Sequence, residues 1–248
     1  MAVSTTTRLV SADTSAPLEV HLLGLVDYPS AVFLQERLVY DISGRDDRLG
    51  ALLLCEHPPL ITVGREGSRA DILADERELA SRQLDVRWTN RGGGCCVHLP
   101  GQLAIYPIIP LNRLSLGLAE YRRRLEEAAV AVCQELRIPA WRETTEPGIW
   151  SRCGQLAQLG VAVRSQVAFH GLFLNVCPPL DELRLIRPGV TGRPAVSLAS
   201  VRNRPIAMHK VRESLIRHLA DHLGYSRHHL YTGHPLLRRT RKRIHVST

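Results

Sequence analysis

Apolar positions recur with a helical period in three parts of the chain. Steps of three and four residues predict amphipathic helices over residues 30–42, 118–136 and 211–219. Gly224 follows the last of them and can terminate it, because glycine readily adopts the left-handed backbone that ends many helices. Helices with one apolar face need a partner surface, so we expect them to pack on a sheet.

Short apolar runs bounded by proline, glycine or polar turns predict the strands of that sheet. They cover residues 51–55, 60–63, 103–109, 155–163 and 168–176. Helices and strands are mixed without strict alternation, which is typical of the α+β or α/β class.

Length and composition agree with one globular domain. The chain has 248 residues, 44% of them hydrophobic, which is enough to bury a sizeable core. The changes in residue composition along the chain predict a disordered N-terminal segment at 1–18, a single domain at 19–231 and a basic tail at 232–248. No apolar run approaches the ~18 residues of a spanning helix. We therefore expect a soluble, cytoplasmic protein with no membrane partner.

The basic charge is concentrated at one end. The net charge is +8, and only Lys210 and Lys242 among the 32 basic residues are lysines. Five basic residues lie between Arg238 and Arg243, and without them the net charge is +3. Such a tail is usually a solvated end, so nucleic acid is only a third, weaker hypothesis for a partner.

Cysteines and histidines give little support for a metal site. None of the six cysteines forms a CxxC pair, which argues against a cysteine zinc site. His218 and His222 share a helix face, with His228 and His229 beyond them, but the glutamate of an HExxH site is absent. We predict no metal.

The densest chemical cluster is RGGGCCVHLPGQ at residues 91–102. Three consecutive glycines allow a close backbone approach or simply a tight turn. No GKS or GKT follows, so a nucleotide-binding P-loop is not supported. His98 alone is more often structural than catalytic.

Together with three other segments, this cluster indicates a family. EHPPLITVGR at 56–65, PGIW at 147–150 and HGLFLN at 170–175 occur around it in a fixed order. The set resembles the lipoyl(octanoyl) transferase family, whose fold is that of biotin/lipoyl protein ligases, over about residues 19–225.

The resemblance implies an α+β fold with a mixed sheet and packed helices. It implies octanoyltransferase activity in protein lipoylation, an acyltransferase step of lipoate biosynthesis. The octanoyl group would pass from acyl carrier protein to a lysine on a lipoyl domain of a 2-oxoacid dehydrogenase or glycine-cleavage protein. No cofactor is implied, because the thioester arrives activated.

The resemblance also assigns a substrate-binding site, which we call the acyl slot. Small residues with apolar neighbours suit an eight-carbon chain, at about 0.8 kcal/mol per buried methylene. The alternative is that the glycines only serve strands and turns. The acyl slot would comprise Arg91, Gly92, Gly93, Gly94, Cys95, Cys96, Val97, His98, Gln158, Leu159, Gly160, Gly171, Leu172 and Phe173.

The family's catalytic pair is missing. Its lysine lies five residues before a strand glycine, a position that Gln155 occupies here. Its acyl-accepting cysteine is either replaced by Gly189 or deleted here. Glutamine supplies no cation to favour a thiolate, and glycine cannot hold an acyl group.

Two main hypotheses follow. In the first, the chain is a transferase whose nucleophile has moved to another cysteine. The candidates are Cys95, Cys96, Cys153 and Cys177, and His98 or His170 could activate the thiol. A small buried thiol is the more common role for each of these cysteines. In the second, the chain is a catalytically inactive acyl- or partner-binding homologue.

Overall fold

The computed structural model describes residues 16–187, 189 and 191–237. Its main element is a sheet of eight strands in the order β11-β1-β2-β6-β10-β9-β8-β7. The strands of this sheet are β1 (Leu18–Leu25), β2 (Gly50–Glu56), β6 (Gln102–Pro110), β7 (Trp141–Arg142), β8 (Gly148–Ser151), β9 (Gly154–Arg164), β10 (Val167–Asn175) and β11 (His228–Thr232). β1 runs parallel to both its neighbours, and the remaining pairs are antiparallel. The expected mixed sheet is therefore confirmed.

A smaller sheet of three strands stands beside the first. Its order is β4-β3-β5, built from β3 (Leu60–Val63), β4 (Asp85–Trp88) and β5 (Cys95–His98). Its apolar core includes Ile61, Val63 and Val97. This sheet carries the central CCVH part of the glycine-rich cluster in β5.

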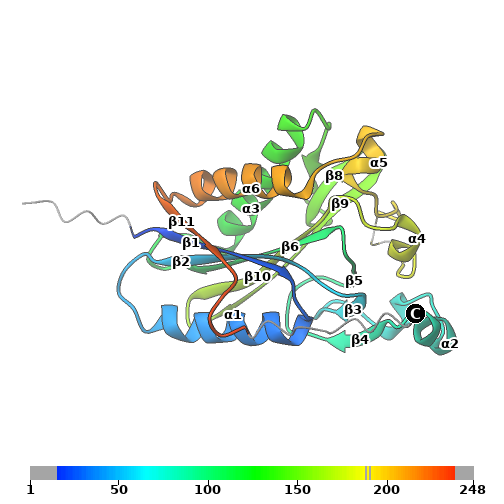
Figure 1. The fold of residues 1–248 in the computed structure, drawn as a ribbon, viewed down its shortest axis with the longest axis horizontal. Coiled ribbons are helices and arrows are strands. Elements are labelled where there is room, and N and C mark those ends of the chain that lie inside the picture. Colours follow the sequence, from blue (N-terminus) through cyan, green and yellow to red (C-terminus); the bar gives the residue numbers. More distant parts are fainter. Residues whose placement is uncertain (1–15, 188, 190, 238–248) are drawn as a thin grey trace, which may run out of the picture.

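Helices cover both faces of the large sheet (Figure 1). The helices are α1 (Tyr28–Ser43), α2 (Glu76–Ser81), α3 (Leu118–Glu135), α4 (Leu180–Leu183), α5 (Leu198–Arg202) and α6 (Met208–Leu223), with a 3₁₀ turn η1 at Arg69–Asp71. α1 packs on one face, and α3 and α6 pack on the other. Two separate apolar cores result, one on each side of the sheet.

Local sequence explains where the predicted helices begin and end. α1 starts where the Asp27 side chain accepts a hydrogen bond from the Ser30 N–H at 2.9 Å, the usual N-cap arrangement. α6 ends at Gly224, whose φ of 80° is the left-handed conformation expected there. The three predicted helices and five predicted strands are confirmed, with ends shifted by a few residues.

The first and last strands of the described residues can be compared with the predicted boundaries. β1 begins at Leu18, which is fully buried although it was assigned to the disordered segment. At the other end, β11 closes at Thr232, the first residue of the predicted tail. The basic run from Arg238 to Arg243 lies outside the described residues. Within the described residues, no helix has the length and apolar character to span a bilayer.

Candidate functional site

The three parts of the predicted acyl slot lie next to one another. The Gly92 N–H donates to the Val161 carbonyl at 3.0 Å, and Gln158 Nε2 donates to the Cys95 carbonyl at 3.3 Å. β9 and β10 pair so that Gly160 lies opposite Gly171. The 91–98 segment therefore sits against β9, and β10 lies directly beyond it.

The glycines here allow backbone to pack on backbone. A Cβ atom on Gly160 would lie 2.5 Å from the Gly92 carbonyl oxygen, and one on Gly64 would overlap the Gly93 carbonyl. Gly93 itself has a φ of 76°, which disfavours other residues. By contrast, a Cβ on Gly94 would meet nothing within 4 Å. Close packing thus accounts for several glycines of the acyl slot, while Gly94 borders open space.

Arg91 holds this loop from inside the protein. Its side chain is only 2% exposed, and Nη2 donates to the Thr62 carbonyl at 3.0 Å and to the Thr62 Oγ1 at 2.9 Å. Further bonds reach the carbonyls of Gly92 and Gly94. The guanidinium lies 5.6 Å from the Phe173 ring centroid. Among the described residues it has no carboxylate partner, so neutral acceptors and an aromatic ring compensate its charge.

His98 is fixed in a buried hydrogen-bond network. Its Nε2 pairs with Thr62 Oγ1 at 2.8 Å, and its Nδ1 pairs with Gln102 Oε1 at 3.0 Å. Burial lowers the pKa of His98 well below its usual value, and the nearby charges of His57 and Arg91 lower it further. The ring is therefore neutral, and no hydrogen bond joins it to a thiol in the described structure.

His170 has an unusual backbone in the middle of β10. Its φ is 57°, and its N–H donates to Gln35 Oε1 at 2.9 Å. The ring bonds Asn90 Oδ1 at 2.8 Å through Nε2, while Nδ1 is buried without a partner. Burial lowers the pKa of His170 to about 3. Like His98, it is not hydrogen-bonded to any described thiol.

Sequence reasoning missed the thiol and imidazole that do meet. Cys55 Sγ lies 3.7 Å from His57 Nε2, which also pairs with the Tyr106 hydroxyl at 2.7 Å. The sequence held one signal for this pair. The two residues are two positions apart, and in an extended segment that spacing places both side chains on one face. Burial raises the pKa of Cys55 strongly and lowers that of His57 to about 4. Both groups are thus neutral, which is unsuited to nucleophilic chemistry.

The four candidate cysteines fall into two pairs. Cys95 and Cys96 are buried, and burial raises the pKa of each thiol, that of Cys96 to about 12. Cys153 and Cys177 are exposed, and partial burial together with Glu56 raises the pKa of Cys177. None of these cysteines combines a place in the acyl slot with a thiol that ionises easily.

The positions of the missing catalytic pair both lie near the loop and strand start at residues 146–148. Gln155 is buried on β9, and its Nε2 would be 3.1 Å from a Cβ atom on Gly148. A Cβ atom on Gly189 would overlap Oε1 of Glu146. Both positions therefore lie next to the same short segment, residues 146–148. A carboxylate occupies the space where a side chain at 189 would begin.

The histidines weighed as metal ligands have other partners. His218 Nε2 bonds Glu135 Oε1 at 2.9 Å, and His222 Nδ1 pairs with the His218 carbonyl at 2.8 Å. Across the described ranges, no three His, Cys, Asp or Glu side chains are grouped to hold a metal ion.

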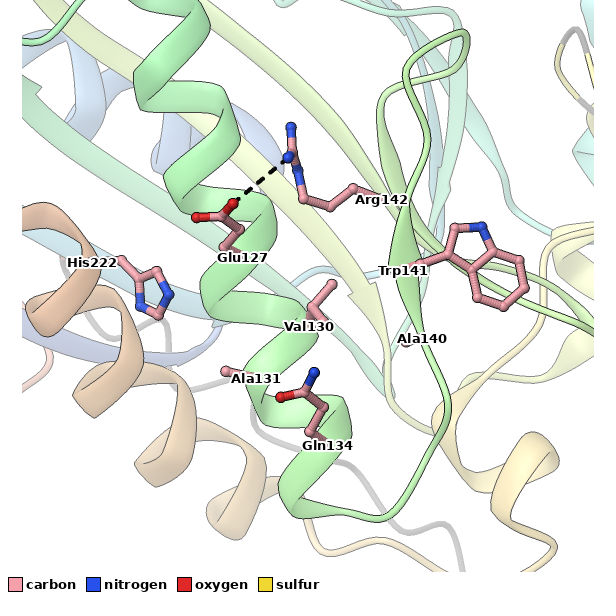
Figure 2. A pocket seen from close by; sticks show the side chains of 8 residues that line it. All are labelled: Glu127, Val130, Ala131, Gln134, Ala140, Trp141, Arg142 and His222. Atoms are coloured by element: carbon pink, nitrogen blue, oxygen red, sulfur yellow. Dashed lines mark ion pairs between the residues drawn. The ribbon is translucent and has the colours of Figure 1, made fainter.

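A surface cavity of about 370 Å³ lies elsewhere, between α3, β7 and α6 (Figure 2). An ion pair of 3.7 Å between Glu127 and Arg142 crosses it. The cavity is lined by Glu127, Val130, Ala131, Gln134, Ala140, Trp141, Arg142 and His222. It includes no residue of the acyl slot.

Solved structures resemble this fold at low sequence identity. Lipoate-protein ligase A bound with ATP superposes with a TM-score of 0.74, at 16% identity, covering 89% of this chain and 91% of that one. A putative lipoate protein ligase from T. acidophilum with bound lipoic acid gives 0.71 at 16% identity, covering 89% and 91%. A biotin protein ligase from Aquifex aeolicus gives 0.51 at 13% identity, covering 84% and 70%. The expected biotin/lipoyl protein ligase fold is confirmed.

Sequence comparisons identify the family. Residues 27–220 match the lipoyl protein ligase A/B catalytic domain. The chain is 36% identical to an octanoyltransferase of Syntrophotalea carbinolica, covering 81% of this chain and 92% of that protein. It is 38% identical to one of Geobacter metallireducens, covering 78% and 87%. By this evidence and by its fold, the chain belongs to the octanoyltransferase family.

Proposed function

We propose that this chain binds the substrates of octanoyltransferases without forming an acyl-cysteine intermediate. Those substrates are an octanoyl group on acyl carrier protein and the lysine of a lipoyl domain from a 2-oxoacid dehydrogenase or glycine-cleavage protein. The observation that carries the proposal is Glu146, whose carboxylate fills the space beside Gly189. The acyl-accepting thiol of the family therefore lacks its residue, and a side chain at 189 would have to displace the Glu146 carboxylate.

The chemistry of the remaining groups supports the same conclusion. A thiol attacks as the thiolate, which a nearby cation stabilises. Gln155 supplies no cation, and Lys210 lies on α6. Burial raises the pKa of the thiols at Cys95 and Cys96, so they do not replace the missing nucleophile.

Binding and acylation can be measured separately. The purified chain is titrated with octanoyl-acyl carrier protein and with a lipoyl domain by calorimetry, and it is examined by intact mass after incubation with the octanoyl donor. We expect saturable binding of both proteins and no added octanoyl group. Failure to bind either protein would overturn the proposal.

A relocated nucleophile is the second candidate function, and one observation favours Cys153 for it. This thiol is exposed in the turn between β8 and β9, two residues from Gln155. A labile octanoyl adduct that disappears in Cys153→Ala, but persists in Cys177→Ala, would establish an acyl-cysteine route. It would also refute the proposal of a chain without one.

A further inference from the structure

Positive charge is concentrated in one segment of the folded domain. Residues 184–212 contain seven arginine or lysine side chains and no aspartate or glutamate. Apart from this segment and the basic run at 238–243, the chain carries a net charge of −4. The domain therefore has a local positive region on an otherwise negative body, and such a region attracts a partner of negative charge.

Some of these cations already have carboxylate partners. The ion pairs are Arg184–Asp181 at 3.4 Å, Arg193–Glu143 at 2.7 Å and Arg212–Glu56 at 3.5 Å. Arg187, Arg202, Arg204 and Lys210 are exposed and have no carboxylate within 4 Å among the described residues. The last three lie within nine residues of one another, and we call them the α5–α6 surface.

The backbone beneath the α5–α6 surface is anchored. Arg202 is the last residue of α5, and α6 begins at Met208, so a single turn separates the two helices. On either side of this turn and within it, buried apolar side chains join the large core, namely Leu198, Ile206 and Val211. The three cations are therefore presented to solvent by a fixed turn, which keeps them close together.

This turn lies near the strands that carry the acyl slot. The Ala199 N–H of α5 donates to the Val176 carbonyl at 3.0 Å, directly after β10. The segment before α5 reaches β9, because the Gln155 N–H donates to the Pro194 carbonyl at 2.9 Å. Figure 1 shows α5 beside β8 and β9. β9 and β10 hold residues 158–160 and 171–173 of the acyl slot, so the α5–α6 surface borders the end of these two strands.

We propose that the α5–α6 surface docks the acyl carrier protein through that partner's negative charge. The inference rests on the proposed function, since it assigns a place to one of its two partners. The carrier holds its acyl chain on a phosphopantetheine arm, whose phosphodiester is an anion that arginine binds well. The lipoyl domain instead presents a lysine ammonium, which a group of cations repels. Charge complementarity therefore selects the carrier.

The test compares the wild-type chain with the triple variant Arg202→Gln, Arg204→Gln and Lys210→Gln by calorimetry. Octanoyl-acyl carrier protein and a lipoyl domain are the two probes. At ~0.1 M salt we expect the Kd for the carrier to rise about 10-fold, because three exposed attractions are lost. At ~1 M salt, where charges are screened, the difference should shrink to less than about twofold. The Kd for the lipoyl domain should stay within about twofold, which also shows that the variant is folded.

A second triple variant is the matched control. It replaces Arg48, Arg77 and Arg137 by glutamine, and these arginines are exposed, lie on other parts of the chain and have no carboxylate within 4 Å among the described residues. The net charge changes equally, but the Kd for the carrier should stay within about twofold.

Three results would overturn the inference. They are equal weakening of carrier binding by both triple variants, unchanged carrier binding in the α5–α6 variant, and weaker binding of the lipoyl domain to that variant. A wild-type chain that binds no carrier protein at either salt concentration would instead refute the proposed function itself.

Discussion

Arg91 and Thr62 are joined through both the backbone and the side chain, since the guanidinium donates to the Thr62 carbonyl and to its hydroxyl. Thr62 Oγ1 also pairs with His98, so one threonine links the buried cation to the buried imidazole. The 91–94 loop is thereby fixed to β3. This connection makes Arg91 important for stability whatever the protein's activity.

Replacing Arg91 should therefore destabilise the fold. Arg91→Met removes the guanidinium donors to the carbonyls of Thr62 and Gly92 and one of the two donors to that of Gly94, and we expect a loss of about 3 kcal/mol in the free energy of unfolding. Urea denaturation followed by tryptophan fluorescence measures it. Arg87→Met, which removes only an exposed ion pair with Asp85, should stay within about 0.5 kcal/mol. Equal effects for the two variants would contradict the assignment.

Close packing against Gly160 gives a second prediction. A methyl group there would press on the Gly92 carbonyl and the Arg91 side chain, so Gly160→Ala should cost about 1–3 kcal/mol of stability. Gly44→Ala is the control, because its Cβ would meet only atoms at 3.9 Å and its φ is −79°. Thermal unfolding distinguishes them, and a Gly160→Ala variant as stable as Gly44→Ala would disprove the tight contact.

Stability should fall in mildly acidic solution. The pKa values of His57 and His170 are lowered to about 4 and about 3 by burial, whereas an unfolded histidine titrates near ~6.5. Between these values the unfolded chain binds more protons, so the free energy of unfolding decreases as the pH falls from ~6.5 towards 4. Each histidine contributes a slope of at most about 1.4 kcal/mol per pH unit.

Denaturant titrations at several pH values test this linkage. His57→Asn should reduce the slope of stability against pH below ~6.5, even if the variant is less stable overall. His209→Gln alters an exposed residue on α6 and should leave the slope unchanged. An unaltered slope in His57→Asn would mean that His57 does not carry the effect.

Thiol accessibility offers a direct check on the cysteines. Two of the six, Cys153 and Cys177, are exposed, and the other four are buried. A chromogenic disulfide reagent should therefore titrate two thiols in the native chain and six in denaturant, since access and thiolate content govern the reaction. Rapid reaction of a third native thiol would indicate that Cys95 or Cys96 is reachable.

Restoring the family pair should be more effective when Glu146 is also removed. Gly189→Cys with Gln155→Lys replaces both missing residues, but the new side chain at 189 meets the Glu146 carboxylate. Adding Glu146→Ala makes room and removes a negative charge that disfavours the thiolate. We expect octanoyl adduct formation at least 10-fold faster in the triple variant than in the double variant. Equal rates would show that Glu146 does not obstruct position 189.

Most of the core elements were predictable, because their apolar periods are strong. The helix over 118–136 and the strand over 103–109 face buried cores and kept nearly their predicted ends. β11 could not be predicted, since all five of its residues are exposed and its alternation carries no signal. β5 was hidden within the glycine-rich cluster, where turn residues dominate the local pattern.

The candidate site was predictable only in part. The family resemblance predicts that Gly92, Gly160 and Gly171 lie in one region, and in the structure the three are neighbours. The contact between Glu146 and Gly189 had no local signal, because it joins residues 43 positions apart in the sequence. The inward orientation of the Arg91 side chain could not be predicted for the same reason, because only the three-dimensional arrangement supplies its acceptors.

The backbone contact between Gly92 and Gly160 has a consequence for how such sequences are interpreted. A packing requirement of this kind persists in any chain that keeps the architecture, whether or not a nucleophile remains. The RGGG signature is thus evidence of the fold, and it does not report whether the family's nucleophile and its activating lysine are present. The residues at 155 and 189 are the ones that distinguish the two cases.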